Sequence, residues 1–219
     1  MTDPMHTYET ALAVPRLAVT RDLSLAMLTS PGCQTQLFAR WLLRFSAHSV
    51  TLTRELEHRD CVKSAVAEGI HAIDRWLVDH LHSHADIASL LDAQLLASAR
   101  RYVFLHEDTA AGSEPRCRAA IQYEFAQLWL GIGPDLLHNC DRTFGADARY
   151  HAAITEQVDL AGKRFPIKRR YVTDSLNEAR TLLPAMIDTG QQALALYSAF
   201  LAECLRLADA DLDVPTRWS

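Results

Sequence analysis

The chain has 219 residues, of which 49% are hydrophobic and 22% charged, and its formal net charge at pH 7 is −5. This composition is that of an ordinary globular protein with enough apolar side chains for a core. The negative charge argues against general nucleic-acid binding, which needs a dominant positive field, and no segment approaches the roughly 20 apolar residues of a membrane span.

Five cysteines are scattered along the chain without any C-x-x-C spacing: Cys33, Cys61, Cys117, Cys140 and Cys204. An odd, dispersed set without a secretory leader is typical of reduced thiols that serve mostly as small core residues. We therefore expect a cytoplasmic protein.

Apolar side chains recur at three- and four-residue steps along almost all of the sequence, and this spacing predicts helices. Residues 1–30 are interpreted as an N-terminal extension. The first half of the pattern predicts three helices, over residues 31–56, 60–82 and 86–105. The polar stretch 107–115 is expected to be a loop.

The second half of the pattern is interrupted by glycine and proline. Pro115 suits a first helical turn, and the helix that it begins is expected to break or kink at residues 131–134, Gly-Ile-Gly-Pro. Further predicted helices end near residues 144, 162, 183 and 207, with a basic loop after the second of them. Residues 209–219 are expected to be a frayed tail.

These elements predict an all-α protein, folded as a single bundle of about seven or eight helices over residues 31–208. Ligand sites in such bundles are built from side chains of facing helices. Any binding residues are therefore expected on the inner faces of these helices.

The segment LLPAMIDTGQQALALYSAFLAEC, which begins at Leu182, resembles the final helices of heme-oxygenase-like proteins. That group includes thiaminase-II-like and pyrroloquinoline-quinone-synthase-like proteins and a branch of di-iron oxidases. The resemblance covers about residues 37–207, and its last quarter is the specific part. It implies a heme-oxygenase-like domain, a homodimer, and oxidation, oxygenation or hydrolysis of a small molecule in cofactor or secondary metabolism.

The di-iron branch carries, on the helix before this segment, a His, an Asp four residues later and a His three further on. Those positions fall here on Gln157, Ala161 and Arg164, none of which suits iron. Upstream, the family's Glu and His seven residues apart fall on Leu77 and His84, where only the His matches. Iron needs several converging carboxylates and imidazoles, so we predict no metal ligands and name no cofactor.

Other registers of this alignment stay open. A slipped register would recruit other residues of the same helix, namely Asp147, His151, Glu156 and Asp159. The family's middle-helix Glu falls on Glu124, or on Ala126 after a shift of two residues. Heme would need a proximal His, for which His48 is the only candidate that we name.

Tyr123 and Glu124 lie on an otherwise apolar predicted helix. Such a Glu is either an exposed surface residue or an inward one, and burial of an inward carboxyl would raise its pKa and suit it to general-base catalysis or substrate anchoring. On the inward alternative, Glu124 or His84 is the catalytic candidate that moves a proton, and Tyr123 is a candidate substrate contact.

His80, His82 and His84 form the densest histidine cluster. In an unbroken helix, His80 and His84 lie one turn apart and would chelate a divalent metal. If Ser83 caps a new helix, that geometry is lost, and the histidines are then a solvated helix end. His80 is kept as a candidate substrate-binding residue.

Five cations lie within eight residues around a Phe-Pro pair, which we interpret as a loop: Lys163, Arg164, Lys168, Arg169 and Arg170. In an acidic protein, such a cluster is either a solvated loop or a site that captures a carboxylate, a phosphate or an acidic carrier protein. Because Arg164 stands where the family keeps an inward ligand, we expect it to hold an anionic substrate group, with Gln157 nearby.

The leading hypothesis from the sequence is a small-molecule enzyme, either oxidase- or oxygenase-like or metal-independent. Its pocket would lie between the helices that carry His84, Glu124 and Arg164. Two alternatives stay open: a non-catalytic small-molecule-binding relative, and a module that docks an acidic carrier protein through its basic loop.

Overall fold

The structure, a computed structural model, describes residues 3–29, 97–144 and 149–212. Within these ranges all regular structure is helical, with five α-helices and two short 3-10 helices. The prediction of an all-α protein is therefore confirmed for the described residues, whereas the count of seven or eight helices stays a prediction. The helices predicted over 31–56 and 60–82 lie outside the described ranges.

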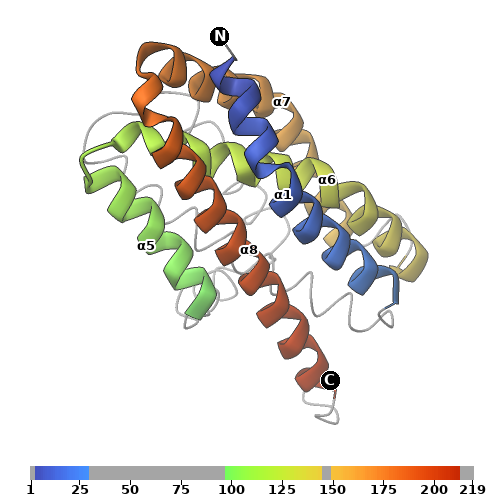
Figure 1. The fold of residues 1–219 in the computed structure, drawn as a ribbon. Coiled ribbons are helices and arrows are strands. Elements are labelled where there is room, and N and C mark those ends of the chain that lie inside the picture. The colour runs from blue at the N-terminus through green and yellow to red at the C-terminus, as the bar shows by residue number, and fades with distance from the viewer. Residues whose placement is uncertain (1–2, 30–96, 145–148, 213–219) are drawn as a thin grey trace, which may run out of the picture.

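The described elements follow one another in a simple order. They are α1 (Pro4–Thr29), α5 (Ala97–Ala111), η1 (Pro115–Cys117), α6 (Arg118–Phe144), α7 (Arg149–Glu178), η2 (Arg180–Leu182) and α8 (Leu183–Leu212). In Figure 1, α8 crosses the molecule with α1 on one side and α5 on the other. None of the described helices is both long and apolar enough to cross a membrane.

The segment interpreted as an N-terminal extension holds α1, which packs against α6 and α8. The carboxylate of Asp3 accepts a hydrogen bond of 3.0 Å from the Met5 amide and so caps the first turn. Tyr8, Leu12 and Val19 are buried, and their spacing of four and seven residues places them on one face of the helix. This apolar face is why α1 belongs to the core.

The prediction of a loop over residues 107–115 is wrong for the first half of that stretch, because α5 continues to Ala111. The hydroxyl of Thr109 donates to the Leu105 carbonyl at 2.6 Å, so this polar turn is satisfied within the helix. The loop is confined to residues 112–114. Pro115 then begins η1, as its fixed φ and missing N–H predict.

The Gly-Ile-Gly-Pro sequence at residues 131–134 does not end a helix, because α6 runs through it with Pro134 in its interior. Packing against neighbouring helices explains the glycines. A Cβ atom at Gly133 would lie 2.2 Å from Cγ2 of Val158 on α7, and one at Gly131 would lie 3.2 Å from Cγ2 of Thr20 on α1. The glycines thus allow close helix approach.

The basic stretch around Pro166 is helical, so its interpretation as a loop is wrong. The single helix α7 replaces a predicted helix, the loop and the first half of the helix predicted over residues 174–183, and it ends at Glu178. Phe165, Val172 and Leu176 continue one apolar face through the stretch and pack in the core. The stabilisation from this packing exceeds the cost of the backbone hydrogen bond that Pro166 cannot donate.

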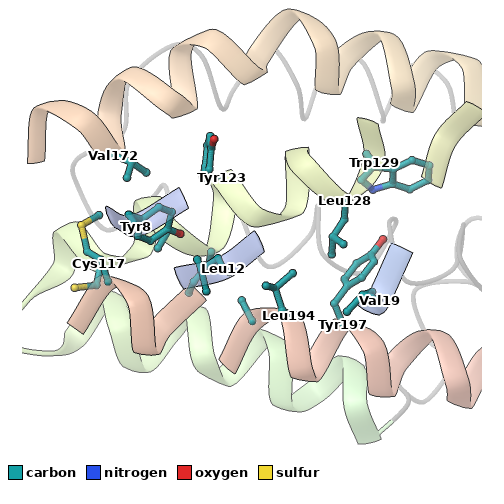
Figure 2. Packing of buried hydrophobic residues seen from close by; sticks show 14 of the residues in the cluster. Tyr8, Leu12, Val19, Cys117, Tyr123, Leu128, Trp129, Val172, Leu194 and Tyr197 are labelled. Atoms are coloured by element: carbon teal, nitrogen blue, oxygen red, sulfur yellow. The ribbon is translucent and has the colours of Figure 1, made fainter. Parts of the chain in front are cut away.

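The core lies where α1, α6, α7 and α8 meet, and α5 closes its far side against α8 (Figure 1). Figure 2 shows Tyr8 and Leu12 from α1, Tyr123 of α6 pointing toward α7, and Tyr197 of α8 beside Leu128. At the α5 end, the amide of Ser98 donates to the Glu203 carboxylate of α8 at 3.2 Å.

We expect Gly133→Ala to destabilise the protein, although Gly→Ala inside a helix ordinarily stabilises by up to about 1 kcal/mol. Val158 is β-branched and cannot swing away from a new methyl group, so overpacking should cost about 1–3 kcal/mol. Urea unfolding monitored by circular dichroism checks this.

Gly162→Ala on α7 is the matched control, because its Cβ would meet only Leu130 at an ordinary 3.9 Å. This variant should be as stable as the parent or more stable. Equal stability gains in both variants would contradict the close approach of α6 and α7 at Gly133.

Candidate functional site

Glu124 on α6 is 1% exposed, and donors from α1 surround its carboxylate. The Tyr8 hydroxyl donates to Oε1 at 2.8 Å. Arg16 donates from Nη2 to Oε1 at 2.8 Å and from Nε to Oε2 at 2.5 Å. This two-pronged arrangement is the strong form of an arginine–carboxylate pair. Of the two alternatives for Glu124, the inward one is therefore observed.

The hydrogen bonds continue from this pair into a larger group, here called the Glu124 network: Tyr8, Glu9, Arg16, Tyr123, Glu124 and Gln127. Nη1 of Arg16 donates to Glu9 at 2.7 Å, and the Tyr123 hydroxyl also donates to Glu9. The Gln127 amide donates to the Tyr123 hydroxyl at 2.8 Å. The network joins α1 to two successive turns of α6.

Neighbouring helices hold these side chains in place. The guanidinium carbon of Arg16 lies 5.5 Å from the ring centre of Tyr123. The ring of Phe165 on α7 stacks on the ring of Tyr123, with 5.4 Å between the ring centres. On α8, a Cβ atom at Gly190 would lie 2.9 Å from the Tyr8 hydroxyl. The missing side chain at Gly190 makes room for the network.

Burial dominates the electrostatics of the Glu124 network. It raises the pKa of Glu124, while the hydrogen bond and charge of Arg16 oppose that rise. Burial, and then the Glu124 charge, raise the pKa of Tyr8 well above its usual value, so Tyr8 stays a donor. Since both oxygens of Glu124 already accept hydrogen bonds, the arrangement suits an interhelical anchor, and the proton-transfer role of Glu124 stays a prediction.

A second polar group, here called the cationic cluster, comprises Lys168, Arg164, Arg118 and His106. Nζ of Lys168 lies 5.9 Å from the ring centre of Phe125. Burial, and then the Arg164 charge one helical turn away, lower the pKa of Lys168 to about 8. A large fraction of this amine is therefore uncharged in mildly alkaline solution.

His106 contributes a neutral imidazole to the cationic cluster. Burial, and then the charges of Arg118 and Lys168, together lower its pKa to about 3. Its Nδ1 atom is buried and has no hydrogen-bond partner among the described residues. An unsatisfied buried polar atom is costly, so this nitrogen is available to a polar group of a ligand.

A continuous row of aromatic rings connects Lys168 to His106. Phe125 meets Tyr197 edge-on at 5.6 Å, Tyr197 meets Tyr102 at 6.2 Å, and Tyr102 meets His106 at 5.1 Å between ring centres. The rings come from α5, α6 and α8, so the row crosses the interior. Lys168 at one end of the row and His106 at the other thus each lie beside an aromatic ring.

The structure divides the predicted site residues between these two groups. Tyr123 and Glu124 lie together in the Glu124 network, whereas the half-buried Arg164 lies in the cationic cluster. Gln157 is on α7, but its side chain is not described. His80 and His84 lie outside the described residues.

Several residues of both groups were missed by sequence reasoning. Tyr8, Glu9 and Arg16 lie in the segment interpreted as an extension, although Tyr8, Leu12 and Val19 already mark an inward face there. His106 was assigned to no site, and nothing local distinguishes it from other polar residues of its turn.

The residues that the predicted resemblance aligns with the iron ligands of the di-iron branch do not suit iron. Ala161 is buried and offers no donor atom, and Arg164 is positively charged. Within residues 3–29, 97–144 and 149–212, no three His, Cys, Asp or Glu side chains gather as a metal site.

Replacing Arg16 with Met should destabilise the protein by about 3–5 kcal/mol at pH 8, because it strands a buried carboxylate. Without Arg16, the pKa of Glu124 in the folded state rises further. A carboxyl group whose pKa is raised in the folded state stabilises the fold at pH values below the ordinary Glu pKa. This stabilisation is lost as the pH rises through the folded-state pKa. The loss of stability in the Arg16→Met variant should therefore be smaller at pH 5 than at pH 8, as measured by urea unfolding at both pH values.

Adding Glu124→Gln to the Arg16→Met variant should recover part of the lost stability, because the buried charge is then absent. Arg170→Met is the matched control, since Arg170 is 83% exposed and pairs with Asp174 only at the surface. An Arg16→Met variant as stable as Arg170→Met would contradict the structural role of the Glu124 network.

We expect Lys168 to react with acetic anhydride along a pH profile with its midpoint at about pH 8. Nα-acetyl-lysine, with its ordinary side-chain pKa near 10.4, is the reference in the same reaction. Peptide mass spectrometry after competitive isotope labelling gives the profile. A midpoint equal to that of the reference would show that Lys168 is solvated.

The comparisons with known proteins leave the family open. No protein-family model matches the chain, and no curated protein sequence matches it. The heme-oxygenase-like resemblance of the segment from Leu182 therefore stays a prediction, and the functional argument rests on the Glu124 network and the cationic cluster.

Proposed function

We propose that this chain binds a small organic anion between its helices and acts on it as a metal-independent, heme-oxygenase-like enzyme. The anionic group lies at Lys168 and Arg164, and the apolar part of the molecule lies against the row of aromatic rings. The Glu124 network holds α1 against α6 and so keeps this interior in place.

The observation that carries the proposal is the position of Lys168. Its ammonium group is drawn into the interior over the Phe125 ring, with the like charge of Arg164 one turn away on the same helix. Burial and the neighbouring Arg164 charge both disfavour the charged form of Lys168. A bound carboxylate or sulfonate would favour that charged form by accepting a charge-assisted hydrogen bond from Lys168.

The enzyme part of the proposal rests on two supporting features. The segment from Leu182 that resembles heme-oxygenase-like proteins forms most of α8, which contributes Tyr197 to the aromatic row. The residues at the family's iron positions, Ala161 and Arg164, favour chemistry without iron. A non-catalytic binding protein is the alternative if bound anions are not converted.

Benzoate is a suitable probe, because it combines a carboxylate with one aromatic ring. We expect benzoate to raise the melting temperature of the protein by mass action and the neutral analogue benzyl alcohol to have no such effect. Because a hydrogen bond to a charged group contributes about 1.5–3 kcal/mol, Lys168→Met and Arg164→Leu should each weaken benzoate binding about tenfold or more in calorimetry.

Lys163→Met is the matched control, because Lys163 is an exposed lysine on the same helix. This variant should bind benzoate as the parent does. Unchanged affinity in the Lys168→Met variant, or an equal loss in the Lys163→Met variant, would contradict an interior anion site.

A second candidate function is docking of an acidic carrier protein, now on a helix rather than a loop. Ile167 and Tyr171 are 47% and 61% exposed one turn apart on α7, and Lys163 and Arg170 flank them. This combination of apolar and basic side chains suits an acidic partner. Its binding would weaken steeply with salt and would be lost in the Lys163→Met variant rather than in Lys168→Met.

A further inference from the structure

We propose that two copies of this chain associate through the outer face of α8, with their α8 helices antiparallel across a twofold axis. Six exposed residues form this face, here called the α8 seam: Asp188, Gln192, Ala195, Ala199, Ala202 and Arg206. This surface is separate from the proposed anion site, because it lies on the outer side of a helix whose inner side contributes Tyr197 to the aromatic row.

The α8 seam has the spacing of a helix-to-helix contact. Its residues recur along α8 at steps of four, three, four, three and four, the alternation that keeps side chains in line toward a facing helix. The buried residues Met186, Ala193, Tyr197 and Phe200 point the other way, into the core. In Figure 1, α1 and α5 flank α8, and the C-terminal part of α8 extends beyond both of them. The described helices thus leave the seam exposed.

The middle of the α8 seam consists of small side chains. Ala195, Ala199 and Ala202 project only methyl groups, so a facing helix can approach more closely than it could over longer side chains. Close approach brings more atoms of the two helices into dispersion contact. Small side chains alone select no partner, whereas the charges at the two ends of the seam do.

These end charges complement those of a second, antiparallel copy. Asp188 lies nine residues before Tyr197, and Arg206 lies nine residues after it, which is a rise of about 14 Å in each direction. A twofold axis at the level of Tyr197 therefore places Asp188 opposite the partner's Arg206, and Ala195 opposite the partner's Ala199. Parallel helices in the same register would instead bring like charges together.

The carboxylate of Asp188 is already oriented within one copy. The Gln192 amide, one turn further along the seam, donates to Oδ2 of Asp188 at 2.7 Å. A carboxylate has about four acceptor positions, so this hydrogen bond leaves room for a guanidinium group. The second copy would supply that group twice, once at each end of the interface.

Charge reversal tests the antiparallel arrangement in the full chain. Sedimentation equilibrium of the parent should show a monomer–dimer equilibrium. Asp188→Arg and Arg206→Asp should each raise the dimer dissociation constant about tenfold at low salt, because each puts like charges together at both ends of the interface. The double variant Asp188→Arg/Arg206→Asp restores opposite charges and should recover the parent value. Failure of this recovery would overturn the antiparallel arrangement.

A substitution in the middle of the seam tests the contact itself. Ala199→Glu places a carboxylate from each copy in the close crossing and should weaken the dimer about tenfold or more. Ala18→Glu is the matched control, because it makes the same change at an exposed alanine of α1. Both variants should keep the parent's circular dichroism spectrum. A parent chain that stays monomeric, or a dimer that Ala199→Glu weakens no more than Ala18→Glu does, would overturn the proposal.

Discussion

The ion pair between Glu124 and Arg16 constrains the described structure more than any other single interaction. A carboxylate that is 1% exposed is tolerable only with a close cation and further donors. Arg16 and Tyr8 supply these from α1, and Gly190 of α8 leaves the space that Tyr8 needs. Helices α1, α6 and α8 must therefore keep one relative position for the charge to remain satisfied.

The cationic cluster has the opposite character. In the Glu124 network, opposite charges compensate one another, whereas Lys168 and Arg164 are like charges on neighbouring turns beside an aromatic ring. The first arrangement stabilises the folded chain, whereas in the second the Arg164 charge, together with burial, disfavours the charged form of Lys168. This contrast is why we propose recognition for Lys168 and a structural role for Glu124.

Local and tertiary effects explain which parts of the fold could be predicted. Pro115 begins a helix as expected, because the first turn leaves its backbone nitrogen without a partner in any case. Pro134 was expected to break or kink a helix and Pro166 to lie in a loop, but neither ends a helix, because packing between α6 and α7 holds the chain helical around them. The glycines beside Pro134 reflect close helix contact rather than a turn.

The amino-acid sequence by itself determined that the described residues are helical and that the full chain is acidic, because the first property follows from spacings of three and four residues and the second from composition. Only the tertiary structure decided which polar side chains share an interior. Glu124 and Arg16 are 108 residues apart in the chain, and they meet only because α1 packs against α6. No local pattern encodes such pairs, since their energies depend on desolvation that arises when the helices pack.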